Sequence, residues 1–128
     1  MLGTDNATVA LVRLALDAAS LRHAAIAGNI ANAGSAGHVR QQVNFEQQLG
    51  FARQTLAAGG SVSAATLAGV EPFVEAAPVP RSALGTASSS LDGDMVQLSQ
   101  NTLRYQALAR ALGRHTAILA IATTEGRR

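Results

Sequence analysis

The sequence predicts a mainly α-helical protein whose two long amphipathic helices, one at each end, pack as an antiparallel coiled-coil-like pair. Near both ends, apolar residues recur at alternating spacings of three and four, which is typical of a helix with one apolar seam. Alanine accounts for 27 of the 128 residues and aromatic residues for 3%, so helix formers outweigh bulky core residues. The middle is rich in Gly, Pro and Ser, which predicts a loop or partly disordered segment with room for short strands.

The first predicted helix occupies residues 1–33, and its regular part begins near Asp5 or Asn6, either of which can cap it. Asn32 and Gly34 suit a left-handed turn at its end. At 1.5 Å per residue the helix is on the order of 40 Å long. Its apolar seam, interrupted only by His23, comprises Val9, Val12, Leu16, Ala19, Ile26, Ile30 and Ala33.

Residues 34–52 read as a glycine-rich turn followed by a docking segment, with an extended piece over residues 39–45 and a helical turn or two over 46–52. Residues 53–88 contain Gly59, Gly60 and all three prolines, and no hydrophobic period survives there. Ordering backbone costs about 1–2 kcal/mol per residue, which small side chains offset poorly. The sequence therefore predicts that residues 53–88 are flexible or are ordered by a partner.

The second predicted helix occupies residues 89–128, with Ser90 as its cap and with Asp92 and Asp94 in the first turn, where the helix dipole favours negative charge. Its seam comprises Leu91, Met95, Leu98, Thr102, Tyr105, Ala109, Leu112, Thr116 and Leu119. An antiparallel register sets Val9 near Leu119, Leu16 near Leu112 and Ile30 near Leu98.

Two helices alone bury one stripe each, and alanine-rich flanks let further helices approach closely. This predicts an assembly of several chains. The seam residues assigned to that assembly are Leu16, Ile26, Ile30, Leu91, Met95, Leu98, Asn101, Tyr105, Leu112 and Leu119.

Composition argues against several function classes. Without cysteine the chain forms neither a disulfide framework nor a thiolate metal site, and without lysine it forms no P-loop. The net charge of +2 is too small to demand a nucleic-acid partner. We expect no catalytic residues, no cofactor and no metal, and neither a cleaved signal peptide nor a membrane-spanning helix.

Two stretches resemble the flagellar rod and axial protein family, in particular its FlgB type. The residues Asn29-Ile30-Ala31-Asn32-Ala33 are similar to the family's NIANA signature at the end of a long N-terminal helix. Gly37 fits the family glycine that follows, while Ala36 and His38 stand where Pro and Tyr are usual. Val43-Asn44-Phe45-Glu46 resembles the family's Val-Asp-Phe-Glu.

The second stretch runs from Leu91 to Leu108 and resembles the FlgB-type pattern in which an acidic residue and Met lead a helix carrying Asn-x-x-x-Tyr-Gln-Ala. Here that pattern is Asn101 followed by Tyr105-Gln106-Ala107. Gly93 departs from the pattern, because a charged helix former is typical there and Gly costs about 1 kcal/mol relative to Ala. The two stretches together cover about half the chain.

The resemblance implies a structural subunit that polymerises helically through its terminal helices into the proximal rod, which crosses the periplasm, transmits torque and lines the export channel. The implied partners are further copies of the chain, rod proteins of the FlgC, FlgF and FlgG types, the adaptor FliE and the flagellar export gate. The subunit would reach the basal body by type III export, without a cleaved signal peptide.

Other interpretations stay open. Within the same class the chain could be a FlgC-like rod protein. From another class it could be a small basic helical DNA-associated protein that uses Arg104, Arg110 and Arg114, although basic DNA readers usually show denser charge. His23 and His115 could in principle form a metal pair, but we expect packed or rim histidines. In the antiparallel register, His23 faces Tyr105.

Overall fold

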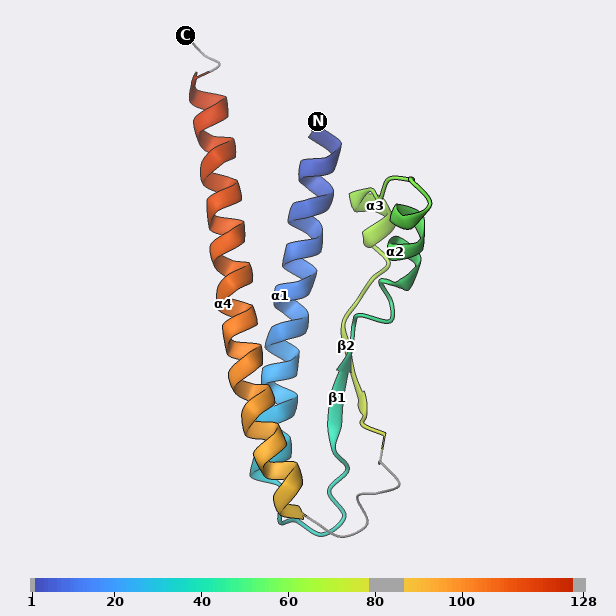
Figure 1. Ribbon diagram of the computed structural model, residues 1–128, viewed down its shortest axis with the longest axis vertical. Coiled ribbons are helices and arrows are strands. Elements are labelled where there is room, and N and C mark those ends of the chain that lie inside the picture. Colours follow the sequence, from blue (N-terminus) through green and yellow to red (C-terminus); the bar gives the residue numbers. More distant parts are fainter. Residues whose placement is uncertain (1, 79–86, 126–128) are drawn as a thin grey trace.

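The computed structural model describes residues 2–78 and 87–125. The elements follow the order α1 (Leu2–Ala31), β1 (Gln41–Asn44), α2 (Gly50–Ala57), α3 (Ala64–Leu67), β2 (Phe73–Ala76) and α4 (Ala87–Glu125). The protein is mainly helical, as the sequence predicts, with one long helix at each end and a short two-stranded sheet between them (Figure 1). No helix within the described residues is long and apolar enough to cross a membrane.

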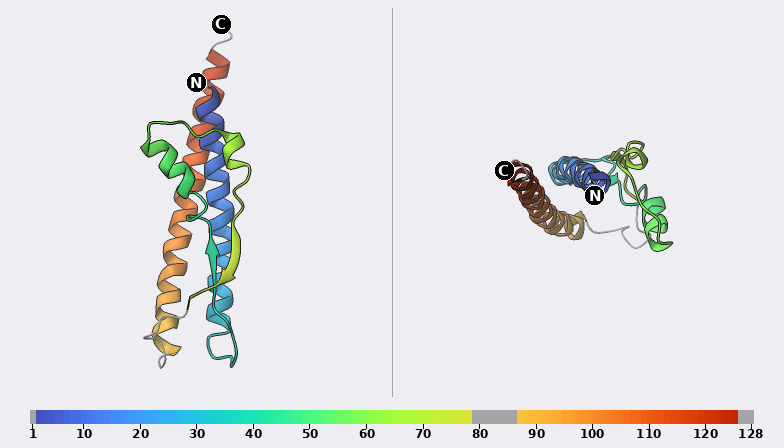
Figure 2. Two further views of the ribbon diagram at one scale, coloured as in Figure 1. Left: turned by 90° about the vertical axis from the view of Figure 1, so that its right-hand side faces the viewer. Right: turned by 90° about the horizontal axis from the view of Figure 1, so that it is seen from above.

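The two long helices lie side by side and run in opposite directions, so both chain ends lie toward the same end of the molecule (Figures 1 and 2). Both extend beyond the caps expected from sequence. Helix α1 begins at Leu2 rather than near Asp5, and α4 begins at Ala87, so Ser90 lies inside it. Residues 87–90 are alanine and serine, which continue a helix at modest cost, so Ser90 did not set the start of α4.

The middle segment packs on α1, on the side away from α4 (Figure 2). Strands β1 and β2 pair antiparallel, with Val43 opposite Val74, and the extended piece expected over residues 39–45 is thereby confirmed. Residues 53–78, which the sequence predicts to be flexible or ordered by a partner, form most of α2, all of α3 and β2, so the short strand for which the sequence left room is present. The buried side chains of Leu67 and Val70 anchor them; residues 79–86 lie outside the described part.

The main hydrophobic core lies between α1 and this middle segment. Its buried members are Ala18, Ala25, Val43, Phe45 and Val70, with Leu14, Ala15, Leu21 and Leu49 packed against them. Helix α1 therefore buries two sides, one against the middle segment and one, with Ala19 and Ile26, toward α4. The expectation of a single buried stripe is corrected, because the short side chains of α1 let the extended β1 segment lie close to it.

Candidate functional site

The end of α1 is joined to β1 through one buried amide. Asn29, 3% exposed, donates from Nδ2 to the carbonyl oxygen of Gln41 at 2.8 Å and accepts from the Gln41 backbone N–H at 2.9 Å. His38 Nε2 lies 3.3 Å from the same Asn29 oxygen. The amide thus pairs with a strand backbone as a neighbouring strand would, and it satisfies groups that are costly to bury unpaired. This gives the first Asn of the family-like motif a structural role.

The turn after α1 depends on Gly37. Its φ is +80°, whereas Gly34 and Asn32 do not have positive φ, so neither adopts the left-handed conformation considered from the sequence. Asn32 instead donates from Nδ2 to the carbonyl oxygen of Gly28 at 2.9 Å, one turn back. Because a Cβ disfavours this region of φ, the hinge is Gly37 alone.

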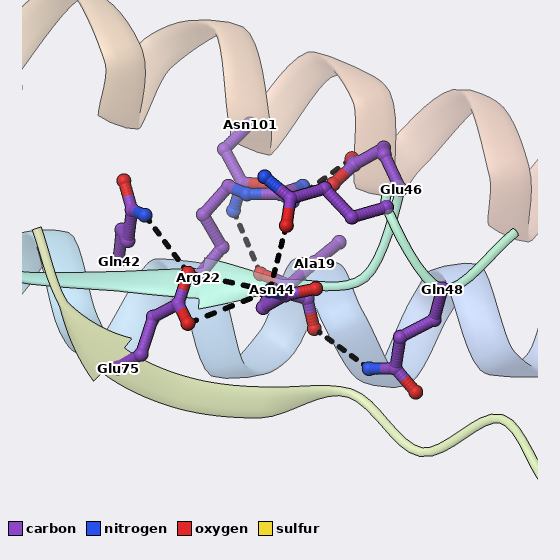
Figure 3. Close-up of polar contacts among 9 residues, drawn as sticks. Ala19, Arg22, Gln42, Asn44, Glu46, Gln48, Glu75 and Asn101 are labelled. Carbon is purple, nitrogen blue, oxygen red and sulfur yellow. Dashed lines mark hydrogen bonds and ion pairs between the residues drawn. The ribbon is translucent and has the colours of Figure 1, made fainter. Parts of the chain in front are cut away.

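The remaining residues of the two motif segments have different environments. Phe45 is buried in the core at 5% exposure. Glu46 is largely exposed, and both its oxygens accept from Arg22 Nη2 of α1 at 2.9 Å (Figure 3). Ile30 is half-buried and Ala33 partly so, while Ala31 is exposed. The motif residues therefore fasten the β1 region to α1 and form no chemical centre.

Helix α4 is held at its N-terminal half by two polar contacts that sequence reasoning did not find. Asp94, 1% exposed, accepts from both terminal nitrogens of Arg40, with Nη1 to Oδ2 at 2.6 Å. The side-chain hydrogen bond to Asp94 is the largest influence on Arg40 and raises its pKa. Asn101, 3% exposed, donates to the carbonyl oxygen of Ala19 at 2.8 Å (Figure 3). Asp94 and Asn101 are the only buried residues of α4 between Leu91 and Thr124.

These contacts place α4 differently from the expected register. In the expected register Ile30 lies near Leu98. Because the helices are antiparallel, Asn101, three residues after Leu98, would then lie near Ala27, three residues before Ile30. The bond to Ala19 is about two helical turns away from that position. His23 and Tyr105 both line one groove between the helices.

Compared with the seam expected from the sequence, these contacts also correspond to a rotation of α4 about its axis. Leu98, Leu112 and Leu119 are half-buried, whereas Leu91, Met95 and Tyr105 are exposed. Of the seam residues assigned to α1, Ile26 is buried and Leu16 and Ile30 are half-buried. Bringing the Asp94 carboxylate to Arg40 turns a neighbouring stripe of α4 toward α1, and that stripe includes Asn101, Leu108 and His115.

A second apolar stripe runs along the opposite side of α4. With roughly 100° of rotation per residue, this outer ridge comprises Val96, Leu103, Ile118 and Ile121, whose exposed fractions are 56%, 67%, 65% and 56%. Arg110 and Arg114 lie on the same side, and both are exposed. A helix that is apolar on two sides is typical of one buried within a larger array.

Neither histidine pairing nor metal binding is evident in residues 2–78 and 87–125. No group of three or more His, Asp or Glu side chains there could hold a metal ion. His115 is half-buried with its Nε2 unpaired, and His23 is exposed at the groove. Arg104 is exposed like Arg110 and Arg114, so these cations lie on solvated surface.

No protein-family model, curated protein or solved structure matches this chain.

Proposed function

We propose that this chain is a structural subunit of the bacterial flagellar basal-body rod, similar to the FlgB type, and that it polymerises helically through its terminal helices. The observation that carries the proposal is the two-sided α4. Only Asp94 and Asn101 are buried between Leu91 and Thr124, while the outer ridge is more than half exposed. The apolar residues of the ridge fall into two exposed groups, Val96 with Leu103 and Ile118 with Ile121, with Arg110 and Arg114 between them. Exposed apolar groups rimmed by polar residues mark interaction surfaces.

The family-like motifs support the flagellar rod as the proposed assembly. Their two distinctive asparagines, Asn29 and Asn101, are both buried, and each bonds a backbone group of another element. They hold α1, β1 and α4 in one arrangement. In the proposed rod, α1 and α4 form a coiled-coil-like inner layer, and the β1–β2 segment faces outward. The partners are further copies, FlgC-, FlgF- and FlgG-type rod proteins, the adaptor FliE and the export gate.

In this role the chain has no catalytic task. It transmits torque along the periplasmic rod and lines the channel through which later subunits pass. Type III export would deliver it without a cleaved signal peptide. Polar contacts such as Arg40–Asp94 and Asn101–Ala19 would form after export and fix the position of α4 for stacking.

The test is deletion of the gene in its source bacterium, followed by purification of basal bodies. We expect non-swimming cells that lack a rod, with swimming restored by the wild-type gene and the protein present in purified basal bodies. The matched control is the gene with Arg53→Ala, a change on the exposed surface of α2. This variant should also restore swimming to the deletion strain. Normal swimming and complete basal bodies in the deletion strain would refute the proposal.

A further inference from the structure

A groove of about 550 Å³ lies between the two long helices, with small residues on its α1 wall. Ala19, His23 and Ala24 line it from α1, and Asn101, Thr102 and Tyr105 line it from α4. Ala24 belongs to an exposed run of small residues with helical spacing, which continues at Ala27 and Ala31. Short side chains along one helix allow a second helix to approach closely.

One side chain of the groove wall, that of Asn101, carries an unsatisfied polar atom. Asn101 is 3% exposed and uses its Nδ2 on Ala19, but its Oδ1 is buried and accepts no hydrogen bond within the described part of the chain. Leaving such an acceptor unpaired is unfavourable, because burial has removed its hydrogen bonds to water. A donor from another molecule seated in the groove would remove this cost.

The chain carries a surface with the complementary properties. The outer ridge of α4 presents large apolar side chains, led by Leu103 at 67% exposed, and carries the exposed guanidinium groups of Arg110 and Arg114. The ridge offers apolar bulk and hydrogen-bond donors. The groove offers a wall of mostly small side chains and an acceptor. Ridge and groove lie on different sides of α4, so they cannot meet within one molecule.

We propose that the groove of one copy receives the outer ridge of α4 from a second copy. The interface is heterologous, because a different surface is used on each side, and it leaves a free groove at one end and a free ridge at the other. Such a contact repeats into an open helical array when the rotation does not close. This inference rests on the proposed function for its biological setting and specifies how successive copies contact.

The absence of cysteine from the sequence makes the contact testable with purified protein. A double variant with Ala24→Cys in the groove and Leu103→Cys on the ridge should give a ladder of disulfide-linked multimers under mild oxidation. Each single variant alone should remain monomeric, and an equimolar mixture of the two should give the mixed dimer. The matched control pairs Leu103→Cys with Ala57→Cys, an exposed alanine of α2, and should give no ladder.

A blocking substitution provides the second measurement. Ser20 is exposed and also lines the groove, so Ser20→Trp should leave the circular dichroism spectrum unchanged while filling the groove. In the chain that carries Ala24→Cys, it should reduce formation of the mixed dimer with Leu103→Cys by about tenfold or more. Ala57→Trp should have no effect.

Two results would overturn the inference. One is that each single variant forms homodimers in place of the mixed dimer. The other is that no mixed product forms at concentrations approaching about a millimolar, which corresponds to roughly 4 kcal/mol of binding free energy. The same negative result is expected if a different protein occupies the groove. Rod function is judged separately. If the protein is found in basal bodies but the Cys variants form no ladder, only the groove contact is refuted. If the Cys variants form a ladder but the protein is absent from basal bodies, only the rod proposal is refuted.

Discussion

The guanidinium group of Arg40, just before β1, holds the buried carboxylate of Asp94 in the third turn of α4 through two hydrogen bonds across 54 residues of sequence. The pair connects the middle segment directly to the second long helix, which otherwise makes few buried contacts. The raised pKa of Arg40 means that its stabilising contribution is fully present below the pKa of the unfolded side chain and is lost only as pH rises through the folded value. The arginine therefore stays charged throughout the neutral range.

Removing the carboxylate should loosen α4. In Asp94→Ala, Arg40 loses its partner, and the free energy of unfolding in urea should fall by about 1.5–3 kcal/mol, the range for hydrogen bonds to charged groups. Asp92→Ala, two residues earlier and exposed, is the control and should change it by less than about 0.5 kcal/mol. Equal losses in the two variants would show that the ion pair contributes nothing specific.

The Asn29 amide should stabilise the docking of β1 on α1. Asn29→Ala leaves the N–H and carbonyl of Gln41 without their partner, and we expect a loss of about 1–3 kcal/mol in the free energy of unfolding. Faster hydrogen exchange at Gln41 should accompany the loss. Asn32→Ala removes only an exposed bond within its own helix end and should cost much less. Slow exchange at Gln41 in Asn29→Ala would contradict the assigned role.

The hinge glycine can be separated from its neighbour. Gly37→Ala places a Cβ at φ +80° and should destabilise the protein by about 1–2 kcal/mol. Gly34→Ala meets no atom within 4 Å and should be neutral or slightly stabilising, because alanine leaves the unfolded chain fewer conformations than glycine does. Thermal unfolding of both variants measures the difference. A larger effect at Gly34 than at Gly37 would move the hinge.

Two leucines of α4 should distinguish contacts within the chain from contacts between chains. Leu112 is half-buried on the side facing α1, whereas Leu103 is 67% exposed on the outer ridge. Leu112→Asp should destabilise the monomer by several kcal/mol, because it brings a charge into a helix–helix contact. Leu103→Asp should leave monomer stability within about 0.5 kcal/mol.

In cells both leucine substitutions should abolish rod assembly and swimming. Urea unfolding together with a soft-agar motility assay measures the two effects. Normal swimming with Leu103→Asp would argue against burial of the outer ridge in the assembly.

The sequence by itself determined the two long helices, the break after α1 and the short extended piece at β1. The 3-4 spacing of apolar residues specifies a helix wherever it persists, and the glycine-rich turn at residues 34–37 marks where it must stop. Those features are local properties, set by backbone preferences and by which residues share a face. The resemblance to the rod family, and not periodicity, singled out Asn29 and Asn101 as motif residues, although not what they bond.

Tertiary structure alone decided which element each face meets. Periodicity assigned Leu91 and Met95 to the seam, yet Arg40 draws Asp94 inward and leaves both residues exposed. Likewise, residues 53–78 show no period, but Leu67 and Val70 are enough to fasten them to α1. One ion pair or one buried side chain can select among faces of similar hydrophobicity, because each contributes free energy comparable to the difference between those faces. Such pairings between residues distant in sequence leave no periodic signal in the chain.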